Sequence, residues 1–130
     1  MQIEKRADGR QPVVLIADDD SLCLDVGMKM LQKLGCRVLD AKDGKEAIEV
    51  FTKNQGVIDL VILDMKMPYN GADTFEKLKE LNSEVKVLVA SGFTEDQCIA
   101  QMKAQGCHGF IQKPFSIELL SEQIASALND

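Results

Sequence analysis

Four short apolar runs of this sequence are each followed by side chains that could take part in chemistry. These side chains are the carboxylates of Asp18, Asp19, Asp20 and Asp64, the hydroxyl of Ser91 and the ammonium of Lys113. Each alone is weak evidence for a site, because Asp and Ser are common in turns and the acidic run 18–20 could be only a helix N-cap. A functional site requires that the fold bring the ends of the four runs together.

The apolar runs alternate with segments of helical periodicity. Strands are expected at 13–17, 37–40, 58–63, 85–90 and 109–112, and helices at 21–34, 43–53, 72–81, 94–104 and 115–128. The first and third runs are apolar at almost every position, as in strands that are buried on both faces. We expect Asp43 to cap the second helix and Gly35 to end the first one.

This alternation predicts the fold class. Five strands that alternate with five helices indicate an α/β fold with a single open, doubly wound parallel sheet and helices on both faces. In such sheets ligands bind beyond the carboxyl ends of the strands, at the point where the strand order reverses. The carboxylates, the hydroxyl and the ammonium all follow strands, so we expect them to gather at that edge of the sheet.

A cluster of this composition favours metal-assisted phosphoryl transfer. Carboxylates a few ångströms apart repel one another, so either one of them keeps its proton or a cation lies between them. Oxygen ligands with open coordination positions suit Mg²⁺, which keeps several waters and completes its shell with phosphate oxygens. A hydroxyl and an ammonium beside a carboxylate would stabilise a phosphoryl group during in-line transfer. The acidic loop 18–20 would repel the phosphate of a nucleotide or flavin unless a metal intervened.

Length, charge and cysteine spacing exclude several other classes. The chain has 130 residues, a usual length for one domain, and a net charge of −6, which argues against direct binding of nucleic acid. We expect residues 1–11 to form a flexible N-terminal tail and residues 12–130 to form the domain. The apolar runs are too short to span a bilayer and no apolar signal segment follows the N-terminus, which predicts a cytoplasmic protein without membrane insertion. Four cysteines without C-x-x-C spacing and a lone histidine argue against a Cys/His metal site.

Four motifs at the ends of the apolar runs are typical of one family in combination. They are Asp18-Asp19, Asp64-Met65-Lys66-Met67-Pro68, Ala90-Ser91-Gly92 and Phe110-Ile111-Gln112-Lys113-Pro114-Phe115. With them, the sequence resembles the response regulator receiver family (CheY-like) from Val13 to about Leu128. The stretches 89–93 and 106–110 are similar to receivers attached to hybrid histidine kinases. The resemblance implies a flavodoxin-like sheet with strand order 2-1-3-4-5.

The resemblance also implies an acceptor residue and a set of metal ligands. Asp64 would be the phosphorylation site and a ligand of Mg²⁺. Asp19 would bind the ion directly, and Asp18 would bind it through a water molecule. The backbone carbonyl of Lys66 would complete the protein's share of the coordination.

Further residues are implied to handle the phosphoryl group and to report its presence. Ser91 would hydrogen-bond the group and Lys113 would pair with it, both as catalytic residues. Ser91 and Phe110 would be the switch residues, although Phe110 lacks the hydroxyl of a tyrosine. The peptide bond before Pro114 is expected to be cis. The loop after Pro68 is one residue shorter than the usual family form.

The implied function is phosphorelay signalling in a two-component system. A histidine kinase or a histidine phosphotransfer protein would be the phosphodonor. Phosphorylation would switch a protein-interaction face toward an unidentified downstream target. Weak or phosphorylation-dependent dimers are a further expectation. Such a domain is a switch that catalyses its own phosphorylation and dephosphorylation rather than a turnover enzyme. Two alternatives stay open from the residues: a receiver-like interaction module that no longer takes phosphate, and a Mg²⁺-dependent phosphatase with an aspartyl nucleophile. The phosphatase is disfavoured because 130 residues leave no room for a substrate-covering cap.

Overall fold

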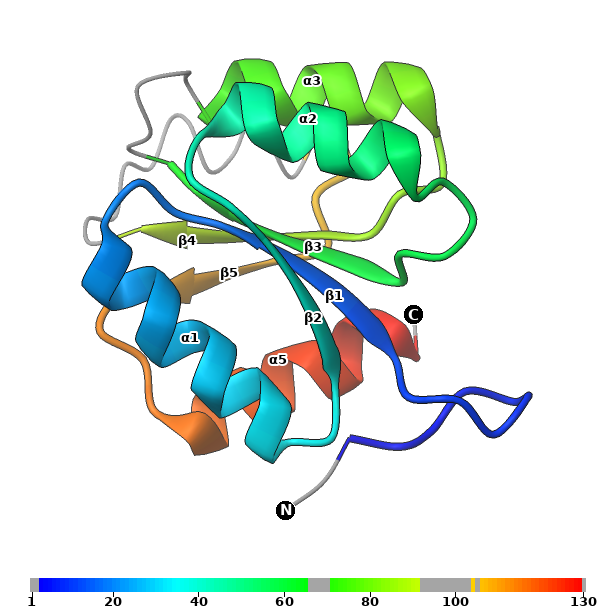
Figure 1. Cartoon of the computed structure of the whole chain (residues 1–130), viewed down its shortest axis with the longest axis vertical. Helices are drawn as coiled ribbons and strands as arrows, with labels where there is room; N and C mark the ends of the chain where they lie inside the picture. The colour runs from blue at the N-terminus through cyan, green and yellow to red at the C-terminus, as the bar shows by residue number, and fades with distance from the viewer. Residues whose placement is uncertain (1–2, 66–70, 92–103, 105, 130) are drawn as a thin grey trace.

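The computed structural model of the chain describes residues 3–65, 71–91, 104 and 106–129 (Figure 1). The strands are β1 (Val13–Ala17), β2 (Arg37–Ala41), β3 (Leu60–Asp64), β4 (Val87–Ser91) and β5 (Gly109–Gln112). The helices are α1 (Ser21–Lys33), α2 (Gly44–Lys53), α3 (Gly71–Leu81) and α5 (Ile117–Leu128). The helix expected at 94–104 lies, apart from its last residue, outside the described residues. None of the described helices is long and apolar enough to cross a membrane.

The five strands form one parallel sheet in the order β2-β1-β3-β4-β5, as predicted. Figure 1 shows α1 and α5 on one face of this sheet and α2 and α3 on the other, which confirms helices on both faces. Strand β1 pairs with both β2 and β3, so the strand order reverses on either side of it. The carboxyl ends of β1 and β3 are therefore the place where this architecture offers a ligand site.

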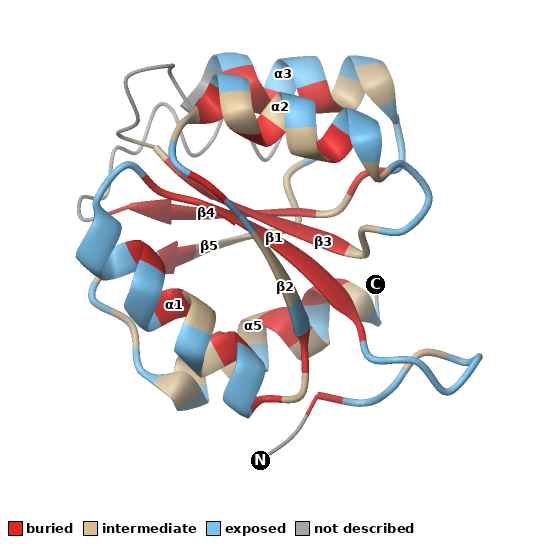
Figure 2. Ribbon diagram, in the orientation of Figure 1, coloured by how far each residue is buried: buried red, intermediate tan, exposed pale blue. Residues whose placement is uncertain are grey.

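Burial of the strands explains why their sequences read as continuous apolar runs. Every residue of β1, β3 and β4 is buried between the two helical layers (Figure 2). Successive side chains point to opposite faces, so Val14 and Ile16 join one core cluster while Leu15 and Ala17 join the other. Each buried aliphatic side chain of this size contributes roughly 1.5–3 kcal/mol. The sheet is thereby a rigid platform for the loops at its carboxyl edge.

Three strands end one residue later than the sequence predicted. The runs 37–40, 58–63 and 85–90 were expected, whereas β2 ends at Ala41, β3 at Asp64 and β4 at Ser91. Parallel pairing continues to these residues, since Asp64 is in register with Ala90, and Ser91 with Gln112. Both polar side chains therefore stand on the sheet itself, with less freedom than loop residues would have.

Helix ends follow local capping chemistry. The side chain of Asp43 accepts a hydrogen bond from the N–H of Glu46 at 2.8 Å, which confirms it as the cap of α2. Gly35 follows α1 with φ of 90°, a left-handed conformation that suits glycine and confirms its role in ending the helix. The last helix begins at Ile117 and not at residue 115, because Ser116 is its cap and accepts from the N–H of Leu119.

The N-terminal stretch 1–11 was expected to be a flexible tail, but its described part contacts the domain. Ile3 is 7% exposed, and its N–H donates to the Leu34 carbonyl at 2.7 Å. Arg6 lies 3.5 Å from Asp59, whose carboxylate also accepts the N–H of Val13 at 2.8 Å. Residues 3 and 6 are thus held against the amino-terminal edge of the sheet. The sequence did not predict this contact, because one isolated apolar residue in a polar stretch forms no recognisable pattern.

Candidate functional site

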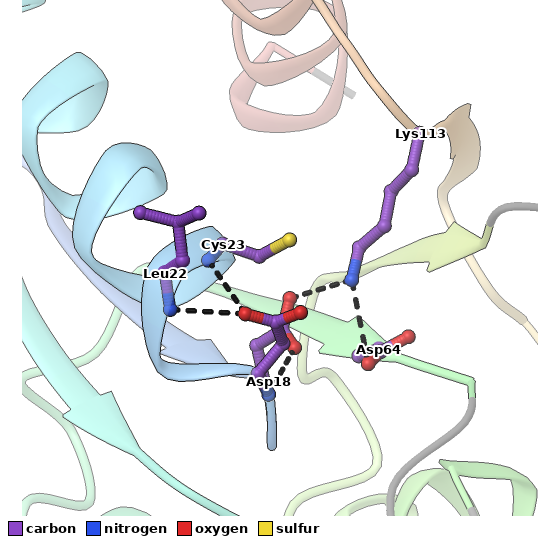
Figure 3. A network of polar contacts seen from close by, with 6 residues as sticks. Asp18, Leu22, Cys23, Asp64 and Lys113 are labelled. Atoms are coloured by element: carbon purple, nitrogen blue, oxygen red, sulfur yellow. Dashed lines mark hydrogen bonds and ion pairs between the residues drawn. The ribbon is translucent and has the colours of Figure 1, made fainter.

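Side chains from three strand ends meet at the carboxyl edge of the sheet. Asp18 follows β1, Asp64 ends β3, and Lys113 follows β5 (Figure 3). Lys113 Nζ lies 2.5 Å from Asp18 Oδ2 and 3.3 Å from Asp64 Oδ2. Since β4 separates β5 from β3, the lysine's long stem is needed to reach these carboxylates. One ammonium therefore contacts two carboxylates from strands far apart in the sequence.

The three consecutive aspartates have different environments. Asp18 is 4% exposed and accepts the N–H of Asp20 at 2.9 Å through Oδ1. Asp20 caps α1, where its Oδ1 accepts the N–H groups of Leu22 and Cys23 at 2.9 and 3.1 Å. These bonds lower the pKa of Asp20, Cys23's N–H contributing most and Leu22's next. Asp19 is exposed. The N-cap interpretation of the acidic run is thus correct for Asp20 and does not account for Asp18.

Three carboxylates of the described part of the chain are close enough together to share one metal ion. One oxygen from each of Asp18, Asp19 and Asp64 lies within 4.8 Å of the other two. The donors are all hard oxygens, two of the residues are buried and one is exposed. This donor set fits Mg²⁺, which uses few carboxylates and leaves open positions for water and phosphate. The predicted fourth donor, the Lys66 carbonyl, lies outside the described residues.

The charge of the cluster is negative even with its lysine. Burial alone would lower the pKa of Lys113, but its hydrogen bond to Asp18 and the charges of Asp64 and Asp18 raise it overall. The lysine is therefore an ammonium at neutral pH. Together with Asp19, the two buried carboxylates leave a net negative site, which a divalent cation would neutralise.

The structure also describes Ser91, Phe110 and the peptide bond before Pro114. Ser91 is 3% exposed, and its carbonyl accepts the N–H of Lys113 at 2.8 Å. Phe110 is half-buried on β5, in register with Val89, and packs against the core cluster on the α2 and α3 face. The Lys113–Pro114 bond is cis, as expected. The loop after residue 65 and the residues that follow Ser91 lie outside the described part.

An apolar groove beside the site was not predicted from the sequence. It has a volume of about 380 Å³ and lies between α1 and the segment after β5, and Asp18, Asp64 and Lys113 are among the residues that line it. Its apolar lining includes Leu22, Val26, Met30, Pro114 and Phe115. Leu22 is 71% exposed and Val26 is 43% exposed. Their spacing of four residues on α1 could have indicated an exposed apolar surface. The buried face of the same helix has a similar spacing of apolar residues, so the pattern alone does not identify the groove.

Comparison with known proteins agrees with this fold. Residues 14–125 match the family model of the response regulator receiver domain. The sensor kinase CckA of Brucella abortus is 31% identical over 130 residues, which cover 98% of this chain and 14% of CckA. The autoinducer 1 sensor kinase/phosphatase LuxN of Vibrio campbellii is 30% identical over 123 residues, covering 94% of this chain and 14% of LuxN. The chain thus spans about one seventh of the length of these relatives.

Solved structures show the same similarity. A chain of the CheX–CheY–BeF₃–Mg complex from Borrelia burgdorferi superposes with a TM-score of 0.88 at 26% identity, over 92% of this chain and 90% of that one. A response regulator receiver domain protein from Clostridium thermocellum gives a TM-score of 0.85 at 33% identity, over 91% of this chain and 94% of that one.

Proposed function

Because this chain belongs to the response regulator receiver family of two-component signalling, we propose that Asp64 accepts a phosphoryl group from a phosphohistidine of a partner protein. The observation that carries this proposal is a buried carboxylate beside an ammonium. The side chain of Asp64 is 7% exposed, and Lys113 Nζ lies 3.3 Å from its Oδ2. The similar Borrelia complex contains Mg²⁺ and BeF₃, which supports a metal-assisted phosphoryl site here.

In the proposed reaction, a carboxylate oxygen of Asp64 attacks the phosphorus atom while the P–N bond of the phosphohistidine breaks. The electrons of that bond stay on the imidazole nitrogen, and an acyl phosphate forms on Asp64. Charge spreads over the equatorial phosphoryl oxygens in the transition state, and the Lys113 ammonium stabilises it. Mg²⁺, held by Asp18, Asp19 and Asp64, would neutralise further charge on these oxygens when bound. Attack of water on the same phosphorus atom, with loss of its bond to Asp64, restores the carboxylate and resets the switch.

Ser91 and Phe110 are the proposed switch residues. Ser91 ends β4 next to Asp64, whose register partner is Ala90. A hydrogen bond from the Ser91 hydroxyl to the phosphoryl group would draw the end of β4 toward Asp64. Phe110 lies on the neighbouring strand in register with Val89. A shift of β4 therefore changes the packing space of the Phe110 ring, which has no hydroxyl and responds through packing alone.

The groove along α1 supports a phosphodonor whose phosphohistidine lies on a helical, partly apolar surface. Leu22 and Val26 present apolar area close to the site, which partner binding would remove from water. The acidic side chains in the lining of the groove favour a partner that brings positive charge around its histidine. A histidine kinase or a histidine phosphotransfer protein has the required chemistry.

Incubation with acetyl phosphate and Mg²⁺, followed by intact-mass measurement, tests the proposal. The wild-type protein should gain one phosphoryl group, and Asp64→Asn should gain none because an amide oxygen is a poor nucleophile. Asp40→Asn on β2, where the side chain is exposed, is the matched control and should behave as wild type. No gain by the wild type would favour the interaction module, and repeated turnover of other phosphate esters would favour the phosphatase.

A further inference from the structure

A second cavity lies at the amino-terminal edge of the sheet, opposite the edge that carries Asp64. Pro12, Asp59 and Lys86, which directly precede β1, β3 and β4, line it together with residues 3–7 and part of α5 (Figure 1). Its volume of about 550 Å³ is that of a site for a small organic molecule. We propose that this amino-edge pocket binds a small organic anion with an apolar body. Such binding does not depend on the phosphoryl chemistry proposed for Asp64.

The N-terminal stretch is held in place as one wall of the amino-edge pocket. Ile3 belongs to the core cluster, and its N–H donates to the Leu34 carbonyl at 2.7 Å. Residues 6–10 close a turn, in which the N–H of Arg6 donates to the Arg10 carbonyl and the N–H of Gly9 donates to the Arg6 carbonyl, both at 2.8 Å. Gly9 has a φ of 83°, a left-handed conformation that suits glycine. The wall is therefore formed before a ligand arrives, which lowers the entropic cost of binding.

The lining of the amino-edge pocket is positively charged, although the chain as a whole is negative. The charged residues of the lining are Glu4, Lys5, Arg6, Asp59 and Lys86. Three cations and two carboxylates give the lining a formal charge of +1, in a chain whose net charge is −6. A ligand with one negative charge would neutralise this lining, whereas a cationic ligand would be repelled.

Arg6 and Lys5 are the cations best suited to hold the anionic group. The guanidinium of Arg6 lies 3.5 Å from Asp59 and 3.8 Å from Asp8, distances longer than the roughly 2.7–2.9 Å of a strong charge-assisted hydrogen bond. Asp59 also accepts the N–H of Val13 at 2.8 Å, so its charge is partly compensated by the fold. The planar guanidinium suits a carboxylate, which it can bind through two parallel hydrogen bonds. Lys5 is exposed and adds a second positive charge at the rim.

The rest of the lining favours a ligand with an apolar body. Ile3, Ala125 and Leu128 contribute apolar surface, and the last two are only half-buried. A ligand that covers them would remove this surface from water. Lys86 Nζ donates to the Leu128 carbonyl at 3.0 Å, which offsets the partial negative charge at the carboxyl end of α5. The expected ligand is therefore a carboxylate on a compact apolar body, and a wholly polar anion would use only part of the pocket.

Titration with naphthoate, followed by amide NMR of the isotopically labelled protein, tests the proposal. Signals of residues 3–7 and 121–129 should shift saturably with a Kd of roughly 1 mM, the affinity of a probe of this size at ordinary ligand efficiency. The neutral analogue naphthalenemethanol should bind at least about fivefold more weakly, and Lys5→Gln should raise the Kd for naphthoate about fivefold. Arg10→Gln is the control: it removes one positive charge from the same turn, where the side chain is 83% exposed and outside the lining, and should leave the Kd unchanged.

A second variant tests the cavity itself. Ala125→Leu narrows the pocket from α5 without a change of charge, and should weaken naphthoate binding while circular dichroism shows a folded protein. Asp64→Asn should bind naphthoate like the wild type, which separates this pocket from the proposed phosphorylation. Shifts confined to the groove along α1, or no saturable shift in residues 3–7, would overturn the proposal. Equal affinities for naphthoate and its neutral analogue, or an unchanged Kd in Lys5→Gln, would do the same.

Discussion

The variant Ile3→Ala tests how firmly the N-terminal stretch is held. Ile3 is 7% exposed and belongs to the core cluster that includes Leu34, whose carbonyl accepts its N–H. Truncation of a buried isoleucine to alanine costs about 2–5 kcal/mol. Ile3 is the most exposed of the buried residues in that cluster, so we expect the low end, about 2 kcal/mol. For a domain of this size that lowers the Tm by roughly 6–10 °C.

Urea unfolding followed by circular dichroism measures this loss directly. The matched control is Leu22→Ala, which removes a similar side chain that is 71% exposed and should change stability by less than about 0.5 kcal/mol. Mg²⁺ affinity and phosphoryl uptake should be unchanged in Ile3→Ala, because Ile3 lies at the opposite edge of the sheet from Asp64. A loss below about 0.5 kcal/mol for Ile3→Ala would refute the contact and restore the flexible tail that the sequence suggested.

Three further predictions concern the metal, the ammonium and the thiols. Asp19→Ala should abolish Mg²⁺ binding in calorimetry and Asp18→Ala should weaken it, whereas unchanged affinity in Asp19→Ala would exclude the site. Lys113→Ala should take up phosphoryl from acetyl phosphate roughly 10²-fold more slowly, the scale of one lost charge-stabilising donor, and wild-type uptake would exclude that role. Burial raises the pKa of Cys36 to about 11, so its thiol stays protonated up to about that pH in the native protein. In the unfolded chain the same thiol loses its proton at a lower pH. Iodoacetamide at about pH 8 should therefore label exposed Cys23 in the native protein and Cys36 only after unfolding, as read by peptide mapping; equal rates would contradict the burial.

The sheet and its reactive edge were predictable because both depend on local patterns. Apolar runs mark buried strands, and the residue after each run lies at the carboxyl edge whatever the details of packing. Asp18, Asp64 and Lys113 were therefore expected together. In the structure, the carboxylates of Asp18 and Asp64 both lie within hydrogen-bonding distance of the Lys113 ammonium. The precise strand ends were missed, since the pairing of Asp64 and Ser91 depends on neighbouring strands and not on their own polar character.

Other features depend on contacts that a linear pattern does not contain. The sequence indicates an ammonium at the rim, but the choice of Asp18 as its nearer partner depends on stem length and on the register of β5. Burial of Ile3 likewise depends on how the chain turns before β1. The groove along α1 forms only when the helix and the segment after β5 are both in place. Each of these three features depends on tertiary packing.

The hydrogen bonds around Asp20 join the carboxylate cluster to the groove along α1. Asp18 accepts the N–H of Asp20, and Asp20 in turn holds the first turn of α1 through the N–H of Leu22. Leu22 is the most exposed apolar residue of the groove. A partner that docks on Leu22 therefore touches the far end of a two-bond linkage that begins at the carboxylate nearest Lys113. If a phosphodonor docks on the first turn of α1, it therefore contacts a segment that two successive hydrogen bonds connect to Asp18.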